Sequence, residues 1–281
     1  RNLCDVLRLV QQAPTSTKTG KLMDTNTYMA VLSFLLGLVL GSFMNVCIYR
    51  IPEKKSIIKP ASHCRTCSAG IKWYDNIPLL SYLILRGRCK QCGAPIGFRY
   101  PLVEGLAGVL SLALFLRHGL GFIYLHTLIF SLSLVVISFI DLDHMIIPDV
   151  LSIPGIIIGI LASFIVPYIS PLESLIGMIA GGGTFYLIAS GYSLLTRKDG
   201  MGGGDIKLIA MIGAWMGWRP LPIVVLVSAL AGTLIGGIFI VASGKGMRTR
   251  IPFGPFLALG ALIYLFFGNE IVIWYIRFLQ G

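Results

Sequence analysis

The chain has 281 residues, of which 56% are hydrophobic and 12% are charged, and its mean hydropathy is +0.83. A soluble domain of this size needs a far more polar surface, so the composition argues against a soluble enzyme and indicates a membrane protein. The formal net charge of +11 does not indicate nucleic-acid binding, because the Lys and Arg residues lie in loops between apolar runs and are not interleaved with stacking aromatics.

Residues 1–27 are polar and lack the apolar core of a signal peptide, so we interpret them as an N-terminal tail in which Met23 is a natural start. The apolar runs that follow approach the length needed to cross about 30 Å of hydrocarbon. They predict an all-α polytopic membrane protein with about eight transmembrane helices. The runs cover residues 28–48, 101–117, 122–141, 150–168, 172–195, 205–218, 220–242 and 252–279.

The sixth run is short and rich in glycine, which predicts a helix that begins below the membrane surface and is covered by its neighbours. Small residues also recur in the later runs, at Gly177, Ala180, Gly181, Gly182 and Gly183 and again at Gly232, Gly236 and Gly237. Small side chains let helices approach closely in lipid, so we favour close packing over a ligand site at these positions.

The loop between the first two runs fixes the expected orientation. Residues 49–100 contain ten Lys or Arg residues against Glu53 and Asp75, and basic loops are retained in the cytoplasm. The other loops predicted to be cytoplasmic carry Arg197, Lys198, Lys245, Arg248 and Arg250. The opposite side carries only Arg117, Arg219 and Arg277 past residue 48. We therefore expect a multi-pass membrane protein with this loop in the cytoplasm.

Two C-x-x-C pairs in the same loop predict a metal site. Cys64 and Cys67 are separated from Cys89 and Cys92 by 21 residues, which is close to the spacing of four-cysteine zinc sites. Four thiolates fill a tetrahedron, so the zinc is expected to be structural; thiols that stay free are the alternative. Cys4, Cys47 and His63 have no evident place in this site.

Placing an acidic residue at the end of a membrane helix costs free energy, so such residues are candidates for a functional site. Asp141 ends the third run, and Asp205 opens the sixth run after Gly202, Gly203 and Gly204. Two carboxyl groups brought together can share one proton and activate a water molecule against a peptide carbonyl, which is the chemistry of aspartic peptidases. The helix dipole favours the anion at Asp205 and disfavours it at Asp141, so we expect Asp205 to be the base and Asp141 the protonated partner.

The neighbouring charged residues have structural interpretations. Asp149 follows Pro148 before an apolar run and is expected to cap the next helix. Asp143 is expected to be a solvated carboxylate at the interface, and Lys207 is expected to extend to the interface as lysines near helix ends do. Glu104, near the inner end of the second run, could pair with a basic residue or serve the loop.

The chain also resembles the type IV prepilin peptidases, which are leader peptidases and N-methyltransferases. The resemblance runs from about Gly41 to Gly260. It is carried by Gly41-Ser42-Phe43-Met44-Asn45, the paired cysteines, Asp75-Asn76-Ile77-Pro78 through Cys89, Arg99-Tyr100-Pro101-Leu102-Val103-Glu104, Asp141 through Asp149, Gly200 to Lys207, and Pro252-Phe253-Gly254-Pro255-Phe256. Asp199 stands where the family usually has glutamate.

The resemblance implies an eight-helix GxGD-type aspartic peptidase of the bacterial inner membrane, with catalytic Asp141 and Asp205 in a core of residues 105–281. It implies cleavage of the basic leader of prepilins or type II secretion pseudopilins after glycine on the cytoplasmic side. It further implies methylation of the new N-terminus with S-adenosylmethionine by the 49–104 loop, where no dinucleotide-type glycine fingerprint marks a cofactor pocket.

Two other classes of protein share some of these features. A transporter or proton-coupled channel also places aspartates and glycine-rich breaks in membrane helices, but transporters often have paired breaks in two halves, and this sequence has one. A noncatalytic scaffold with a zinc-bound docking loop gives no reason for Asp141 and Asp205 to stand at helix ends. The sequence does not indicate the oligomeric state.

Overall fold

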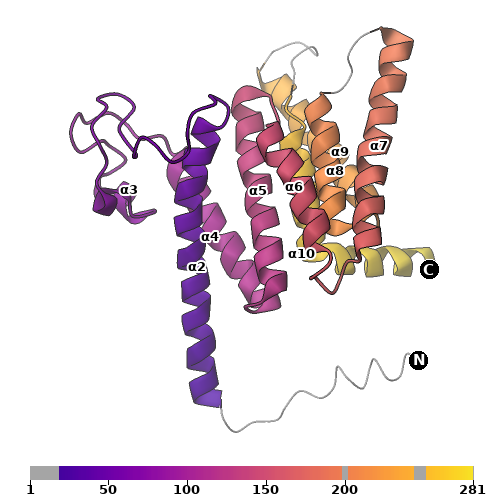
Figure 1. Cartoon of the computed structure of the whole chain (residues 1–281), viewed down its shortest axis with the longest axis horizontal. Coiled ribbons are helices and arrows are strands. Elements are labelled where there is room, and N and C mark those ends of the chain that lie inside the picture. Colours follow the sequence, from indigo (N-terminus) through magenta and orange to yellow (C-terminus); the bar gives the residue numbers. More distant parts are fainter. Residues whose placement is uncertain (1–18, 198–201, 244–250, 281) are drawn as a thin grey trace.

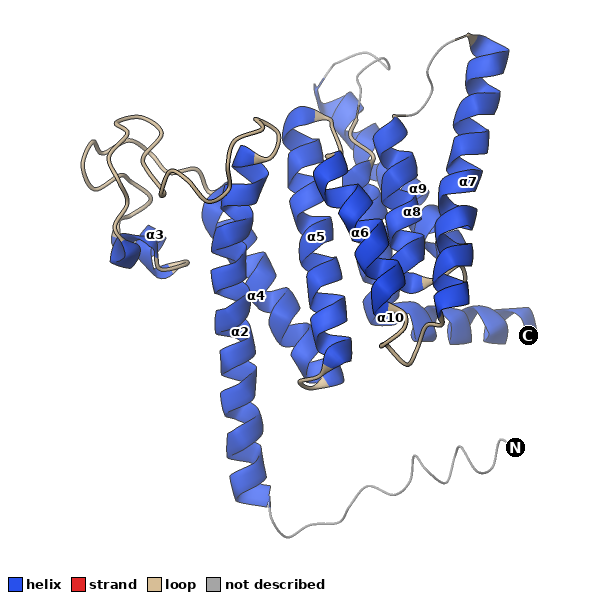
Figure 2. Cartoon of the chain, in the orientation of Figure 1, coloured by secondary structure: helices blue, strands red, loops and turns tan. Residues whose placement is uncertain are grey.

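The computed structural model of the chain describes residues 19–197, 202–243 and 251–280, which form a bundle of helices without a named β-strand. Cys4, Lys198, Asp199, Lys245, Arg248 and Arg250 lie outside these ranges. The helices that match the apolar runs are α2 (Thr19–Arg50), α4 (Arg99–His118), α5 (Phe122–His144), α6 (Asp149–Ala162), α7 (Pro171–Thr196), α8 (Gly203–Met216), α9 (Leu221–Ser243) and α10 (Gly254–Gln280). Figure 2 shows them side by side, with loops at both ends.

The helical membrane fold is confirmed, but a count of eight spans is not. Among the described residues, six helices are long and apolar enough to cross a membrane. The other two, α6 and α8, have 14 residues each. At 1.5 Å per residue they are about 21 Å long, which is shorter than the hydrocarbon layer. As expected for the glycine-rich run, α8 is covered by its neighbours, and its residues from Leu208 to Trp215 are buried.

Helix α5 is the centre of the bundle because it contributes to both apolar cores. On one side, Leu128, Val136 and Ile140 pack with residues of α2 and α4. On the other side, Phe130 and Ile137 pack with residues of α7, α8, α9 and α10. The two halves of the chain are therefore joined through one helix, and its C-terminal end carries Asp141.

Glycines set the distance between α7 and α8. A Cβ atom on Gly213 would lie 2.1 Å from the carbonyl oxygen of Gly177, and one on Gly181 would lie 2.8 Å from that of Ile209. Ser174 adds a hydrogen bond from its hydroxyl group to the carbonyl of Ala214, at 2.6 Å. The predicted role in close packing is confirmed at Gly177 and Gly181. It does not extend to Gly183, where an added Cβ would meet open space.

The loop between α2 and α4 lies beside one end of the bundle (Figure 1). It contains a short 3₁₀ helix, η1 (Trp73–Asn76), and the helix α3 (Leu80–Ile84). The C-terminal end of α5 and the N-terminal ends of α6 and α8 are at the same end of the bundle as this loop. The last turns of α10 lie across the opposite end.

Candidate active site and metal centre

Asp141 occupies the last turn of α5 and is almost fully buried, with 5% of its surface exposed. The helix ends just after it because Met145 adopts a left-handed conformation with φ of 54°, and the amide of Met145 donates to the carbonyl of Asp141 at 2.8 Å. A carboxyl group buried at the end of a membrane helix needs a hydrogen-bonding or charged partner.

Gly254, the first residue of α10, supplies that partner. Its backbone N–H donates to Oδ2 of Asp141 at 3.0 Å. A Cβ atom at Gly254 would lie 2.7 Å from the same oxygen, so the approach requires glycine. The motif around Gly254 contributes to the family resemblance, but the residue types alone give no role for it. Its backbone donor becomes visible only when α5 and α10 are brought together.

Asp205 lies in the first turn of α8, as the glycine-rich run predicts. Its backbone N–H donates to the carbonyl of Gly202 at 3.2 Å, and its side chain is partly buried. The side chain of Ile147 links this turn to Asp141: a Cβ atom on Gly204 would lie 2.9 Å from Ile147, and one on Gly254, the donor to Asp141, would lie 3.4 Å from the same side chain. The fold thus brings the two predicted aspartates together from the end of one helix and the start of another.

Both aspartates lie beside backbone groups that favour a negative charge. The N-terminus of α8 favours the charged form of Asp205. The N–H of Gly254, however, favours the charged form of Asp141, and the sequence-based expectation did not include it. Each carboxyl group therefore has one neighbour that favours its charged form, so the helix dipole alone does not decide which of the two is ionised.

Asp149 does not cap α6, which corrects the sequence-based interpretation. Pro148 is the N-cap residue without a side-chain cap, and Asp149 is the first residue of the helix. Its carboxylate instead accepts a hydrogen bond from Nζ of Lys207 at 2.5 Å. Asp143 is partly exposed, as expected, but it also forms an ion pair with Arg99. Both acidic neighbours of the aspartate pair are therefore held by basic side chains.

The four predicted cysteine ligands converge in the loop. The sulfur atoms of Cys64, Cys67, Cys89 and Cys92 all lie within 4.8 Å of one another, and those of Cys64 and Cys92 are 3.8 Å apart. A zinc ion with four bonds of about 2.3 Å to sulfur separates its ligands by about 3.8 Å, so the cluster fits a tetrahedral metal ion. The backbone amides of Cys67 and Thr66 lower the pKa of Cys64 to about 6. Against the Ala94 amide, the neighbouring cysteine side chains raise the pKa of Cys92 to about 11, so Cys64 is the first of these two thiols to ionise in the metal-free cluster.

Each half of the cluster is the same turn. The pattern Cys-x-x-Cys-x-Ala-x-Ile occurs at residues 64–71 and again at 89–96. The first cysteine N–H of each half donates to the alanine carbonyl, at 2.9 Å for Cys64 and 2.8 Å for Cys89. Ser68 and Gly93 take equivalent left-handed conformations, with φ of 57° and 69°. This short repeat strengthens the metal prediction and could have been found by aligning the two halves.

Glu104 anchors the loop to the bundle. Its side chain is buried in α4, and Oε2 accepts a hydrogen bond from the backbone N–H of Leu79 at 2.8 Å. Gly41 lets α2 approach here, because a Cβ atom on it would lie 2.7 Å from Cα of Glu104. Among the described residues Glu104 forms no ion pair, so the first of its two expected roles is not observed.

Two acidic side chains of the loop form ion pairs with basic side chains of the same loop. Glu53 pairs with Lys55 at 2.5 Å, and Asp75 pairs with Lys90 at 3.2 Å. The ring of Trp73 is exposed and offers a stacking surface. These observations identify no pocket for S-adenosylmethionine within the described part of the loop.

Two family models match the chain in succession. Residues 35–118, which include the cysteine loop, match the Bacterial Peptidase A24 N-terminal domain. Residues 128–237, which include both aspartates, match the Type IV leader peptidase family. The order of the two matches is the order in which the loop and the aspartate pair occur in the fold.

The chain matches curated relatives over nearly the whole length of those relatives. The Prepilin leader peptidase/N-methyltransferase of Aeromonas hydrophila is 40% identical over 269 residues, which cover 87% of this chain and 93% of the relative. The proteins of the same name from Legionella pneumophila and Pseudomonas aeruginosa are 38% and 36% identical and are covered to 96% and 93%. No solved structure matches the chain significantly.

Proposed function

Because the chain belongs to the type IV leader peptidase family, we propose that it cleaves the leader peptides of prepilins or type II secretion pseudopilins and methylates the new N-terminus. Relatives named for both activities are 36–40% identical and are covered over more than nine-tenths of their length. Both family models lie on this one chain, in agreement with a bifunctional enzyme.

Asp141 and Asp205 are the catalytic residues in this proposal. The observation that supports the assignment is that the end of α5, which carries Asp141, and the start of α8, which carries Asp205, meet around Ile147. A pair that shares one proton can remove a proton from water with its charged member and donate one toward the peptide carbonyl with its neutral member. Neither group is assigned as the base, because each has one neighbour that favours its charged form.

The two aspartates lie at the end of the bundle that carries the basic loop, and we assign this end to the cytoplasm. The ten Lys and Arg residues of the loop support that orientation. A prepilin with a basic leader followed by an apolar segment can place the apolar segment in the bilayer and its cleavage site at the interface. The leader is not recognised through the net charge of the loop, because both are basic.

The cysteine cluster holds a structural zinc ion in this proposal. The four sulfur ligands leave no open coordination position, so the metal would stabilise the turns at 64–71 and 89–96 in a loop that has almost no buried apolar residues. S-adenosylmethionine supplies the methyl group when bound. We assign methylation to the 49–104 loop as a whole and assign no residue to the cofactor.

The test is cleavage of a purified prepilin in proteoliposomes by the parent protein, Asp141→Asn and Asp205→Asn, with mass spectrometry of the product N-terminus. The parent is expected to remove the leader and, with S-adenosylmethionine present, to add one methyl group. Each variant is expected to lose cleavage and to keep its thermal unfolding temperature. Asp149→Asn is the matched control, because it removes a carboxylate at the same end of the bundle.

Cleavage by both asparagine variants would overturn the catalytic assignment and leave the family assignment intact. Absence of cleavage by the parent protein, with any prepilin or pseudopilin, would overturn the proposed substrate. A cleaved but unmethylated product in the presence of S-adenosylmethionine would support the peptidase activity and contradict the methyltransferase activity.

A further inference from the structure

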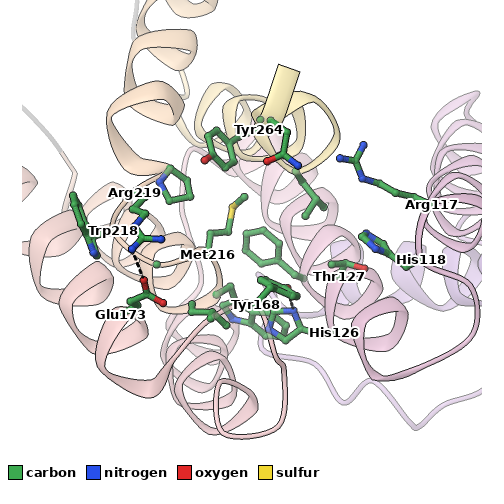
Figure 3. Close-up of a pocket in the computed structure, with 18 residues that line it drawn as sticks. Arg117, His118, His126, Thr127, Tyr168, Glu173, Met216, Trp218, Arg219 and Tyr264 are labelled. Carbon is green, nitrogen blue, oxygen red and sulfur yellow. Dashed lines mark hydrogen bonds and ion pairs between the residues drawn. The ribbon is translucent and has the colours of Figure 1, made fainter. Parts of the chain in front are cut away.

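A second polar site lies at the end of the bundle opposite to the aspartate pair. It is a cavity of about 380 Å³ between the C-terminal ends of α4 and α8, the N-terminal part of α5 and the middle of α10. Figure 3 shows basic, aromatic and acidic side chains around it. Its volume lies within the range of small-molecule sites in proteins. The aspartates stand at the other ends of α5 and α8, so the peptidase chemistry does not use this cavity.

The charged groups of the cavity have an excess of positive charge. Arg117 and Arg219 line it, and Glu173 is the one acidic side chain among its described lining residues. Glu173 already has partners. Its Oε1 lies 3.2 Å from Nη2 of Arg219 in an ion pair, and its side chain forms a capping box with Ser170 at the start of α7. Arg117 donates to the carbonyl of Phe266, and no described carboxylate lies within 4 Å of it. One guanidinium charge is therefore uncompensated.

His126 adds a buried hydrogen-bonding atom without a partner. Its exposed fraction is 6%, its Nδ1 lies 2.6 Å from the hydroxyl of Tyr168, and its Nε2 has no partner. If the hydroxyl donates to Nδ1, the proton of the neutral ring is on Nε2, which is then a donor at the cavity wall. Nε2 of His118, a second lining residue, is also buried without a partner. Buried nitrogen atoms nearly always have a hydrogen-bond partner, so these two atoms indicate a partner that the described part of the protein does not supply.

Aromatic residues place the cavity at the level of the lipid headgroups. Trp218 and Tyr168 line it and are about half exposed, and Tyr264 lines it from α10. The last turns of α10 lie across this end of the bundle (Figure 1) and carry the exposed Trp274. Trp and Tyr concentrate at the boundary between hydrocarbon and water, where phosphate groups of lipids are found.

We propose that this cavity binds a phosphate group, as carried by the headgroup of an anionic phospholipid or by free phosphate. Arg117 supplies the unpaired charge, Arg219 supplies a second guanidinium group, and Nε2 of His126 supplies a donor when it carries the ring proton. Guanidinium groups match the geometry of phosphate and bind it by two parallel hydrogen bonds. The site lies away from the peptidase, and its occupancy is independent of the proposed function.

The test uses the whole purified chain in detergent and native mass spectrometry with phosphatidylglycerol, phosphatidylcholine or inorganic phosphate. The parent protein is expected to bind phosphatidylglycerol in preference to phosphatidylcholine. Arg117→Gln and Arg219→Gln are each expected to weaken this binding about tenfold or more, as expected for loss of a charged hydrogen-bond partner. Arg277→Gln is the matched control, because it removes an arginine from α10 that does not line the cavity.

Glu173→Gln distinguishes a binding site from a merely structural effect. It removes the negative charge and keeps a side chain that can cap α7, so it is expected to strengthen anion binding, whereas general damage to the fold would weaken it. Inorganic phosphate that displaces the lipid with the same arginine dependence would identify a site for free phosphate as well. Lipid binding that phosphate does not displace would identify the headgroup as the ligand. Equal binding of both lipids with no effect of phosphate, or equal losses in all four variants, would overturn the proposal.

Discussion

The backbone N–H of Gly254 donates a hydrogen bond to Oδ2 of Asp141 at 3.0 Å, although 113 positions separate the two residues in the chain. The contact joins the start of α10 to the end of α5 at the candidate active site. It orients one carboxylate oxygen and leaves the other available for water or for Asp205. A main-chain donor suits this role because it is held by the helix and does not add a titratable group.

Gly254→Ala is expected to lower the rate of prepilin cleavage about 100-fold, because misplacement of a reacting group by about 1 Å has an effect of this size. The added Cβ atom would lie 2.7 Å from Oδ2 of Asp141, so the carboxyl group or α10 must move. The measurement is kcat for cleavage in detergent. Gly237→Ala, at a position with open space, is the control and should retain activity. Equal rates for the two variants would show that Gly254 does not position Asp141.

Removal of one cysteine ligand is expected to release the metal. The purified protein should contain about one zinc ion per chain, and Cys64→Ser or Cys92→Ser should lose it, because structural zinc sites use four protein ligands. Elemental analysis measures the metal, and limited proteolysis should show faster cutting between residues 54 and 98 in the variants. Cys47→Ala is the control, since Cys47 is buried in the helical core away from the cluster. Full zinc occupancy in Cys92→Ser would exclude the tetrad.

The helices and the ligand residues could be read from the sequence, because apolar length and cysteine spacing are local patterns. Each apolar run became a helix, and Asp141 and Asp205 stand at the ends expected for them. The failures were non-local. Asp149 has the sequence context of a cap, but Lys207, one turn into α8, competes for its carboxylate. The Gly254 donor also depends on two helices meeting, which no local pattern encodes.

The contact between α7 and α8 gives a prediction for stability. Gly213→Ala would place a Cβ atom 2.1 Å from the carbonyl of Gly177, a main-chain atom that cannot rotate away. Overpacking of this kind is expected to destabilise the protein by about 1–3 kcal/mol. Thermal unfolding in one detergent measures the effect. Gly183→Ala is the matched control on α7: its Cβ atom meets open space, and alanine favours the helix, so its unfolding temperature should be unchanged or higher.

The ion pair between Arg99 and Asp143 connects the loop to the peptidase helices, since Arg99 begins α4 and Asp143 lies two residues after Asp141. Both side chains are partly exposed, so solvent and salt screen the pair, and a double-mutant cycle with Arg99→Gln and Asp143→Asn is expected to give a coupling of at most about 1 kcal/mol in stability. The coupling should shrink as salt is raised.

Because this ion pair is weak, Asp143→Asn should keep cleavage within a few-fold of the parent, whereas Asp141→Asn should abolish it. A loss of cleavage in Asp143→Asn as complete as that in Asp141→Asn, with the fold intact, would instead place Asp143 in the reaction.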